Sequence, residues 1–298
     1  YIVPIISIFV NKTFTHCSHS RHITVRKALY HVIMKEAVNM SISTFKRYEK
    51  KYMLSEAQYR ELNRALSEHM VCDANCRDGA MYTIYNVYYD TDNDEIIQKS
   101  LSKPYYKEKL RMRSYDIPKT GDDKVYLELK KKIGGIVSKR RVAMTCSEAE
   151  AFVEKGIRPQ NQDYISRQVT GEIEFFLKNH RVSPKVFIAY QRNAYFDRDD
   201  SSFRITFDSS IRTRRTSPQL KFGDFGQLLL SEGTYLMEVK TSGALPLWLT
   251  SEFSRLGIRS QSFSKYGTEY KRRISYIKKE NYSKKKENYN KEEGRIIC

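Results

Sequence analysis

The stretch KEKLRMRSY, from Lys107 to Tyr115, carries a cation at every second position: Lys107, Lys109, Arg111 and Arg113. Successive side chains of a strand point to opposite faces of the sheet, so this spacing predicts a row of positive charge along one face. Like charges in a row repel each other. A protein that keeps such a row therefore needs negative charge close to it, either from its own carboxylates or from an anionic partner.

Strand-like runs of the same kind recur along the chain and decide the fold class. They are rich in Tyr, Val, Ile and Phe, and most are joined by short connections. The runs are residues 45–54, 81–90, 106–115, 124–132, 136–144, 185–196, 203–211 and 234–241. We predict an α+β protein in which about eight strands form a closed antiparallel β-barrel. Helices would decorate the outside of this barrel.

Four helices are predicted between the strands. Ser55 with Gln58 forms a capping box that opens a helix running to Met70, and Ser147 with Glu150 opens a short helix that ends before Gly156. The third helix spans residues 163–179, with apolar residues at helical spacing. The fourth helix begins at Pro246 and ends at Gly257.

Charge and composition divide the chain into three parts. The formal charge of the whole chain is +18, and residues 271–298 carry 10 Lys or Arg against 4 Glu in a low-complexity sequence that we expect to be a disordered or fraying extension. Residues 1–43 are expected to be an extension outside the fold, which leaves 44–270 as one moderately basic domain. No apolar run reaches the roughly 20 residues of a membrane helix, so we expect a soluble, cytoplasmic domain.

In several of the predicted strands, a set of charged residues stands two or four positions apart, so its members are all odd-numbered or all even-numbered; we call this a shared parity. Residues of one parity lie on one face of a strand. Examples are Glu128 with Lys130, Lys139 with Arg141, and the pair Arg204 and Asp208. On a single strand, this pattern would be typical of the solvated face of a sheet. If helices cover the outside of a barrel, however, the charged rows point inward, where unpaired buried charge costs several kcal/mol per ion. We therefore predict a wet, cation-lined tunnel that accepts a chain of phosphates.

The motifs on these strands resemble a known family. Arg47-x-Glu49-x-Lys51, YYDT (88–91), Lys109-x-Arg111-x-Arg113, YLELKKK, SKRRVAM, YQRNAY, FRITFD, MEVK and SFSKY are similar to the polyphosphate polymerase domain of the vacuolar transporter chaperone (VTC) family. That family belongs to the triphosphate tunnel metalloenzymes, also called CYTH-like proteins. The resemblance covers residues 45–270.

The resemblance implies roles for particular residues. It assigns Arg111, Arg113, Lys130, Arg192 and Arg204 to the catalytic set, which contacts the reacting phosphates. Further phosphate ligands would be Lys51, Lys109, Lys139, Arg141, Lys240 and Lys265. Glu238 in MEVK corresponds to the family's metal-binding glutamate, with Mn²⁺ or Mg²⁺ as the cofactor. Arg47 stands where the wider superfamily carries the first glutamate of E-x-E-x-K, and this departure favours a polymerase over a two-metal hydrolase.

The resemblance implies an ATP-dependent polyphosphate polymerase, a transferase whose partners are ATP and polyphosphate. Two alternatives remain open: a tripolyphosphatase or nucleoside triphosphatase of the same fold, and a non-catalytic module that binds polyphosphate or inositol phosphates. A nucleic-acid partner is not expected, because no RNA-binding signature accompanies the basic residues. No P-loop is present either, since KKIGGIVSK lacks the Gly-Lys-Ser/Thr ending. Any membrane-protein partner stays unidentified.

Overall fold

The computed structural model describes residues 48–296, except 77–79, 135, 161–162 and 201. The predicted extension (1–43) and the beginning of the first predicted strand, with Arg47, lie outside the described residues.

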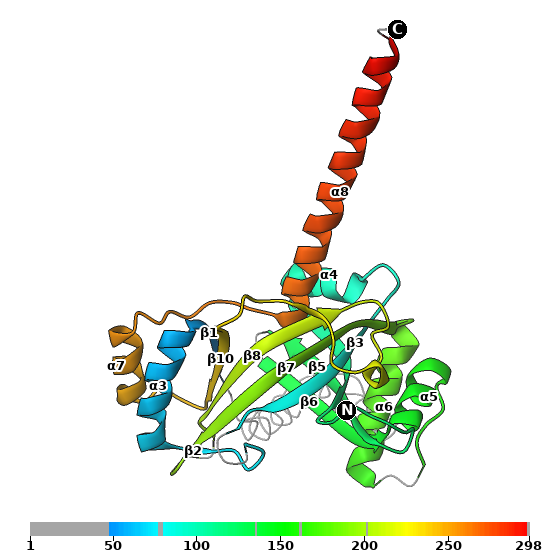
Figure 1. The fold of residues 1–298 in the computed structure, drawn as a ribbon. Helices are drawn as coiled ribbons and strands as arrows, with labels where there is room; N and C mark the ends of the chain where they lie inside the picture. The colour runs from blue at the N-terminus through cyan, green and yellow to red at the C-terminus, as the bar shows by residue number, and fades with distance from the viewer. Residues whose placement is uncertain (1–47, 77–79, 135, 161–162, 201, 297–298) are drawn as a thin grey trace, which may run out of the picture. The chain divides into compact units, whose positions relative to one another are not determined.

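One antiparallel sheet dominates the structure, and its path runs β1-β10-β8-β7-β3-β4-β5-β6 (Figure 1). The strands on this path correspond to the eight predicted runs. They are β1 (Tyr48–Ser55), β3 (Tyr82–Asp90), β4 (Tyr106–Ser114), β5 (Lys124–Ile133), β6 (Ile136–Thr145), β7 (Ser183–Asp197), β8 (Arg204–Arg214) and β10 (Thr234–Thr241). Two short strands that the sequence did not predict, β2 (Met70–Cys72) and β9 (Gln227–Leu228), pair with β7 and β8.

The helices largely follow the predicted signals. Ser55 and Gln58 form the predicted capping box at the start of α3 (Glu56–His69), and Asp163 caps α6 (Tyr164–Asn179). Pro246 precedes α7 (Leu247–Arg255). The capping box predicted at Ser147 was wrong, because Thr145 and Glu148 form the box that opens α5 (Cys146–Lys155). The helix α4 (Glu95–Leu101) and the short 3₁₀ helix η2 (Leu220–Phe222) were not predicted.

Apolar side chains on the outer face of the sheet anchor two pairs of helices. Leu127 and Leu129 of β5 pack with Phe152 of α5 and Phe176 of α6 in one buried cluster. A second cluster joins β1, β8 and β10 to α3 and α7, and these helices lie together at that end of the sheet (Figure 1). Because the helices occupy the outer face, the alternating charged positions point to the inner face, as predicted.

The sheet is open in the described residues, since β1 and β6 are edge strands that do not pair with each other. The predicted closure of the barrel is therefore not confirmed. The segment after α7 runs along β1 instead. Tyr52 forms an isolated antiparallel β-bridge with Ser260, and the backbone amide of Gln261 donates a hydrogen bond to the carbonyl oxygen of Lys51. This segment lacks the length of a regular strand, which explains why it covers the edge of β1 without continuing the ladder.

The inner face is not lined by charge alone. Ile84, Ile188, Ile211 and Leu236 form a buried apolar cluster there with Tyr266 and neighbouring residues. This cluster was not predicted from the sequence. Several of its residues have the same parity as charged or polar residues of their strands, for example Leu236 and Glu238, and we assigned that face to charge.

Helix α8 (Lys265–Ile296) includes most of the tail that was predicted to be a disordered or fraying extension, so the expectation of disorder was wrong. Lys, Glu and Arg are good helix formers, and the first turns of α8 are held by the body of the domain. The hydroxyl of Tyr266 donates a hydrogen bond to the carboxylate of Asp90, and the carboxylate of Glu269 accepts two hydrogen bonds from the guanidinium of Arg215. Among the helices of the described part of the chain, none is both long and apolar enough to cross a membrane.

Candidate functional site

Strand register brings the predicted residues to one face of the sheet. Residues directly opposite in antiparallel strands lie on the same face. The register pairs Lys51 with Glu238, Lys240 with Arg204, Arg192 with Asp208, Arg111 with Glu128, Lys109 with Lys130, Lys130 with Lys139, and Glu128 with Arg141. Arg113 lies on the same side of β4 as Arg111. The last predicted residue, Lys265, is the first residue of α8.

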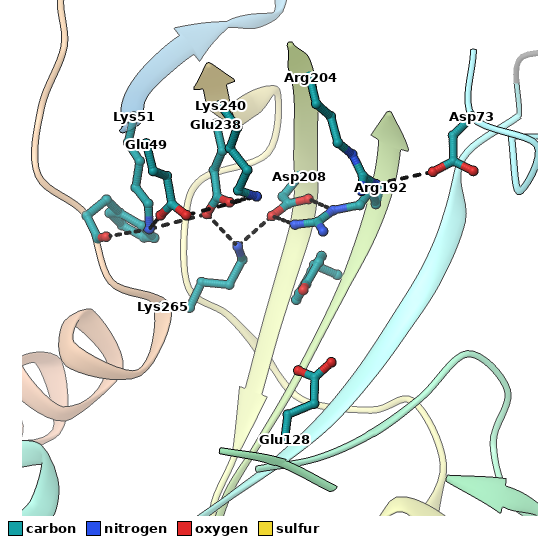
Figure 2. Close-up of polar contacts among 12 residues, drawn as sticks. Glu49, Lys51, Asp73, Glu128, Arg192, Arg204, Asp208, Glu238, Lys240 and Lys265 are labelled. Atoms are coloured by element: carbon teal, nitrogen blue, oxygen red, sulfur yellow. Dashed lines mark hydrogen bonds and ion pairs between the residues drawn. The ribbon is translucent and has the colours of Figure 1, made fainter. Parts of the chain in front are cut away.

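The first group of charges, the Glu238 cluster, gathers Glu238, Glu49, Asp208, Lys51, Lys240, Lys265 and Arg192 (Figure 2). The Glu238 carboxylate lies 3.2 Å from Lys51 Nζ, 3.4 Å from Lys240 Nζ and 3.9 Å from Lys265 Nζ. Burial alone would raise the pKa of Glu238, but Lys51, Lys265 and Lys240 outweigh burial and hold that pKa well below its usual range. Glu238 is therefore a carboxylate anion within a positive field.

Asp208 is the most deeply buried carboxylate of the Glu238 cluster, with no exposed surface. It accepts two hydrogen bonds from Arg192, at 2.6 and 2.7 Å, and one from Lys265 at 2.5 Å. Burial would raise its pKa, yet Arg192 and Lys265 keep the pKa lowered. A bidentate pair of this kind fixes the orientation of the guanidinium as well as its charge.

The second group, the Glu128 cluster, places four cations around one carboxylate that is 1% exposed. Oxygen atoms of Glu128 lie 2.6 Å from Arg111, 3.1 Å from Arg141, 3.4 Å from Lys139 and 3.9 Å from Arg113. Burial opposes ionisation of Glu128, but Arg111, Arg113 and Lys139 hold its pKa far below the usual range. One carboxylate cannot neutralise four cations, so the cluster keeps an excess of positive charge.

Polar side chains hold the arginines of the Glu128 cluster in place. Arg111 donates to the Tyr88 hydroxyl at 3.0 Å. Arg113 donates to Asn86 at 2.9 Å and to the Tyr190 hydroxyl at 3.1 Å. Lys265 Nζ lies 4.3 Å from the centre of the Tyr190 ring, so Tyr190 contacts cations of both clusters.

Charges on β1, an edge strand, and on β5, the strand next to the other edge, interact across the inner face. Lys130 of β5 and Glu49 of β1 are separated by most of the sheet path. Burial would raise the pKa of Glu49, but the charges of Lys130, Lys51 and Lys240 together keep it lowered. The charge of Lys130 on β5 therefore acts on β1 across the inner face of the sheet.

Three buried polar atoms on the inner face have no hydrogen-bond partner among the described residues: Arg141 Nε, which lies 3.1 Å from Glu128 only as an ion pair, Arg204 Nε and Thr206 Oγ1. Arg204 reaches Asp73 at 3.2 Å through another guanidinium nitrogen, which leaves Nε free to donate. Thr206 lies opposite Glu238 in the register. Orphaned polar atoms of this kind are costly unless a ligand satisfies them.

The structure brings together all the predicted site residues, but sequence reasoning left out the carboxylates that organise them. Their spacing along the strands had already placed Glu49, Glu128 and Asp208 on the charged face, but they were not included among the predicted site residues. The spacing along β8 would also place Arg212 and Arg214 on the inner face with Arg204 and Asp208, but they lie on the outer face. A bulge at Ser210, where φ is 48°, shifts the register between Asp208 and these two arginines.

A metal site built from protein donors alone is not present in the described residues, since no three His, Cys, Asp or Glu side chains are placed to hold one ion. Glu238 still fits a hard cation in one respect. Mg²⁺ is commonly bound through one or two carboxylates while phosphate oxygens and water complete its shell. The ionised carboxylate of Glu238, next to unsatisfied donors that suit phosphate, is compatible with that arrangement.

Comparison with known protein families decides the assignment. The family model described as "VTC domain" matches residues 46–273. This chain belongs to the VTC domain family. The match covers every strand described above and includes the first turns of α8, so the expected resemblance is confirmed, and it supports a polyphosphate-related function for this VTC domain.

Solved structures add more distant similarities to the VTC domain. A candidate adenylate cyclase of Bacillus halodurans is 12% identical with a TM-score of 0.43, over 74% of this chain and 95% of that one. A chain of the Schizosaccharomyces pombe Mediator head module is 13% identical with a TM-score of 0.37, over 71% of this chain and 90% of that one. No curated protein sequence matches. The family match alone therefore carries the assignment.

Proposed function

We propose that this VTC domain is an ATP-dependent polyphosphate polymerase. The observation that carries the proposal is the convergence of Arg111, Arg113, Lys139 and Arg141 on one buried carboxylate, with a second cation-rich cluster facing it. Phosphoryl transfer requires alignment and neutralisation of negative charge more than a protein nucleophile. The inner face supplies both through guanidinium forks and ammonium groups.

The reaction would join two phosphates within this field. A terminal oxygen of the polyphosphate chain attacks the γ-phosphorus of ATP, a new P–O–P bond forms, and the bond to the β-phosphate oxygen breaks to release ADP. Arg111 and Arg113 are already oriented by Tyr88, Asn86 and Tyr190, so little reorganisation is needed when phosphates bind. In the Glu238 cluster, Arg192 and Lys265 are positioned by Asp208 to contact the other reacting phosphate.

Glu238 would hold Mg²⁺ or Mn²⁺ together with phosphate oxygens. Such an ion, when bound, neutralises charge that develops on the transferred phosphoryl group. The protein's own part is to keep Glu238 ionised, which the neighbouring lysines do. Arg204 Nε and Thr206 Oγ1, both unpartnered, would donate hydrogen bonds to phosphate oxygens on the same face.

Purified protein incubated with ATP and Mg²⁺ or Mn²⁺ tests the proposal when long-chain polyphosphate is separated from free phosphate on a gel. We expect polymer to accumulate together with ADP. Free phosphate without polymer would support the tripolyphosphatase alternative, and no turnover of ATP would support a binding module. Arg141→Ala should abolish polymer formation, whereas Arg140→Ala should preserve it, because Arg140 faces outward and pairs with Glu172.

A further inference from the structure

A group of lysines on the inner face differs from both clusters. The lysine track, as we name it, consists of Lys107 and Lys109 on β4 and of Lys130 and Lys132 on β5. None of these residues forms an ion pair with a carboxylate in the described part of the chain, whereas each tunnel arginine named above lies within 4 Å of one. The track therefore carries positive charge that no paired carboxylate neutralises in the described residues, although Lys107 Nζ donates a hydrogen bond to the carbonyl oxygen of Ser100 at 3.0 Å.

Strand register forces the lysines of the track against each other. Lys107 lies opposite Lys132, and Lys109 lies opposite Lys130, on neighbouring antiparallel strands. Like charges directly opposite in a sheet are destabilising. Burial and the charges of Lys132, Lys103 and Lys130 lower the pKa of Lys107, and burial lowers the pKa of Lys109 to about 8. An anion bound along this row would relieve the repulsion.

The track continues directly from the Glu128 cluster. Along β4, exposure rises from Arg113, which is buried, to Lys109 and Lys107, which are half-buried. On β5, Lys130 and Lys132 are exposed, whereas Glu128 is buried. The row thus leads from the arginine-rich centre to solvent, at the end of the sheet where the β5–β6 hairpin turns.

The difference between arginine and lysine indicates in which direction a phosphate chain would move along this row. Arginine forks grip a phosphate in a fixed geometry, whereas lysine is a flexible point charge that binds phosphate without fixing its orientation. In the Glu238 cluster, the carboxylates Glu49, Asp208 and Glu238 pair with most of the positive charge, whereas no carboxylate of the described residues pairs with the lysine track, so a polyanion meets more uncompensated positive charge along the track. A chain of phosphates that must slide after each transfer is better served by the lysines.

We infer that Lys107 and Lys132, which lie beyond the site residues assigned above, form an outer subsite for polyphosphate along which the growing chain leaves the Glu128 cluster. The inference rests on the proposed function for the direction of chain growth. The binding itself depends only on the charges and their register. Long polyphosphate would span the Glu128 cluster and the outer subsite, whereas tripolyphosphate would occupy the Glu128 cluster alone.

The test compares two double variants of the full chain that remove the same charge from opposite faces. Lys107→Ala/Lys132→Ala removes the outer subsite. Lys131→Ala/Arg140→Ala is the matched control, because both residues face outward and pair with Glu172 of α6. Thermal unfolding of each variant establishes that it is folded, and the first should be no less stable than wild type because it relieves repulsion.

Binding is measured by competition with long-chain polyphosphate, tripolyphosphate and single-stranded RNA. Lys107→Ala/Lys132→Ala should weaken long-chain binding by about tenfold and reduce its salt dependence, as expected when two contacts to phosphates are lost. Its affinity for tripolyphosphate should stay at the wild-type value, and the control should match wild type for both ligands.

Three results would overturn the subsite. They are unchanged affinity for long chains, an equal loss for tripolyphosphate, and RNA that competes as strongly as polyphosphate. The last would assign the track to nucleic acid. A wild-type protein that binds long chains through Lys107 and Lys132 but makes no polymer from ATP would leave the subsite in place and refute the polymerase. If polymer is made, the first variant should release ADP normally at the start but accumulate shorter chains.

Discussion

Lys265 Nζ donates a hydrogen bond to Asp208 Oδ2 over 2.5 Å, although the two residues are 57 positions apart in the sequence. Asp208 lies within β8 and Lys265 begins α8, so this contact joins the sheet to the segment that passes the edge of β1 (Figure 2). The same carboxylate holds Arg192. The protein's own carboxylate therefore holds two cations of the proposed site in position.

Arg113→Ala is expected to lower ATP turnover by about a hundredfold or more, because a positioned donor to the reacting phosphates is lost. Arg113 is 6% exposed and is fixed by Asn86 and Tyr190, so the loss is one of alignment as well as charge. Steady-state kinetics on the folded variant measure the effect, with outward-facing Arg140→Ala as the control. Wild-type turnover by Arg113→Ala would remove this residue from the catalytic set.

Glu128→Gln should destabilise the protein by about 3 kcal/mol near neutral pH, since four cations lose their shared carboxylate. The folded-state pKa of Glu128 is lowered from its ordinary 4.5, so its stabilisation is present above pH 4.5 and is lost as the pH falls towards the lowered pKa. Urea unfolding at several pH values checks this. The variant and wild type should converge in acid, and a constant difference would contradict the linkage.

Glu238→Gln tests the proposed metal carboxylate. The change preserves shape but removes the charge that a hard cation requires. We expect ATP turnover to collapse at every Mg²⁺ or Mn²⁺ concentration, while polyphosphate binding persists or strengthens because a repulsive carboxylate is gone. Glu232→Gln, which alters an exposed carboxylate just before β10, is the control. Turnover at the wild-type level in Glu238→Gln would make this residue structural.

Affinity for polyphosphate should fall as the pH rises above about 8. Burial lowers the pKa of Lys109 to about 8, and burial together with the surrounding cations lowers that of Lys139 to about 8 despite the carboxylate of Glu128. Only the ammonium form binds phosphate well, and binding raises its pKa, so affinity is highest below pH 8 and declines above it. Titrations between neutral and alkaline pH measure the decline. Replacing both lysines with arginine should flatten the profile.

A truncated protein of residues 40–275 should fold and turn over ATP. The family match ends at residue 273, and the contacts that anchor α8 involve Tyr266, Glu269, Arg272 and Arg273. Circular dichroism and the polymer assay measure the outcome. A second truncation ending at residue 262 serves as the contrast: it removes Lys265 and should lose activity. Activity in the shorter form would show that Lys265 is dispensable.

Local patterns were enough to predict most elements of this fold. Alternating parity identified the strands of the main sheet path and the cations of one face, because a strand has a period of two and needs no tertiary information. The capping box at Ser55 was equally local. The box at Ser147 was misplaced by two residues, since Thr145 with Glu148 fits the same signature.

Long-range geometry decided the rest. The spacing of residues along a strand carries no information about how far a sheet curves. We therefore did not predict that β1 and β6 stay unpaired, or that the chain around Ser260 lies along β1. We also did not predict that Asp208 and Glu128 compensate part of the positive charge from within. The sequence by itself determined that a row of cations shares one face. Only the tertiary structure decided which carboxylates meet those cations and which lysines remain without one, because register and curvature depend on packing between residues far apart in the chain.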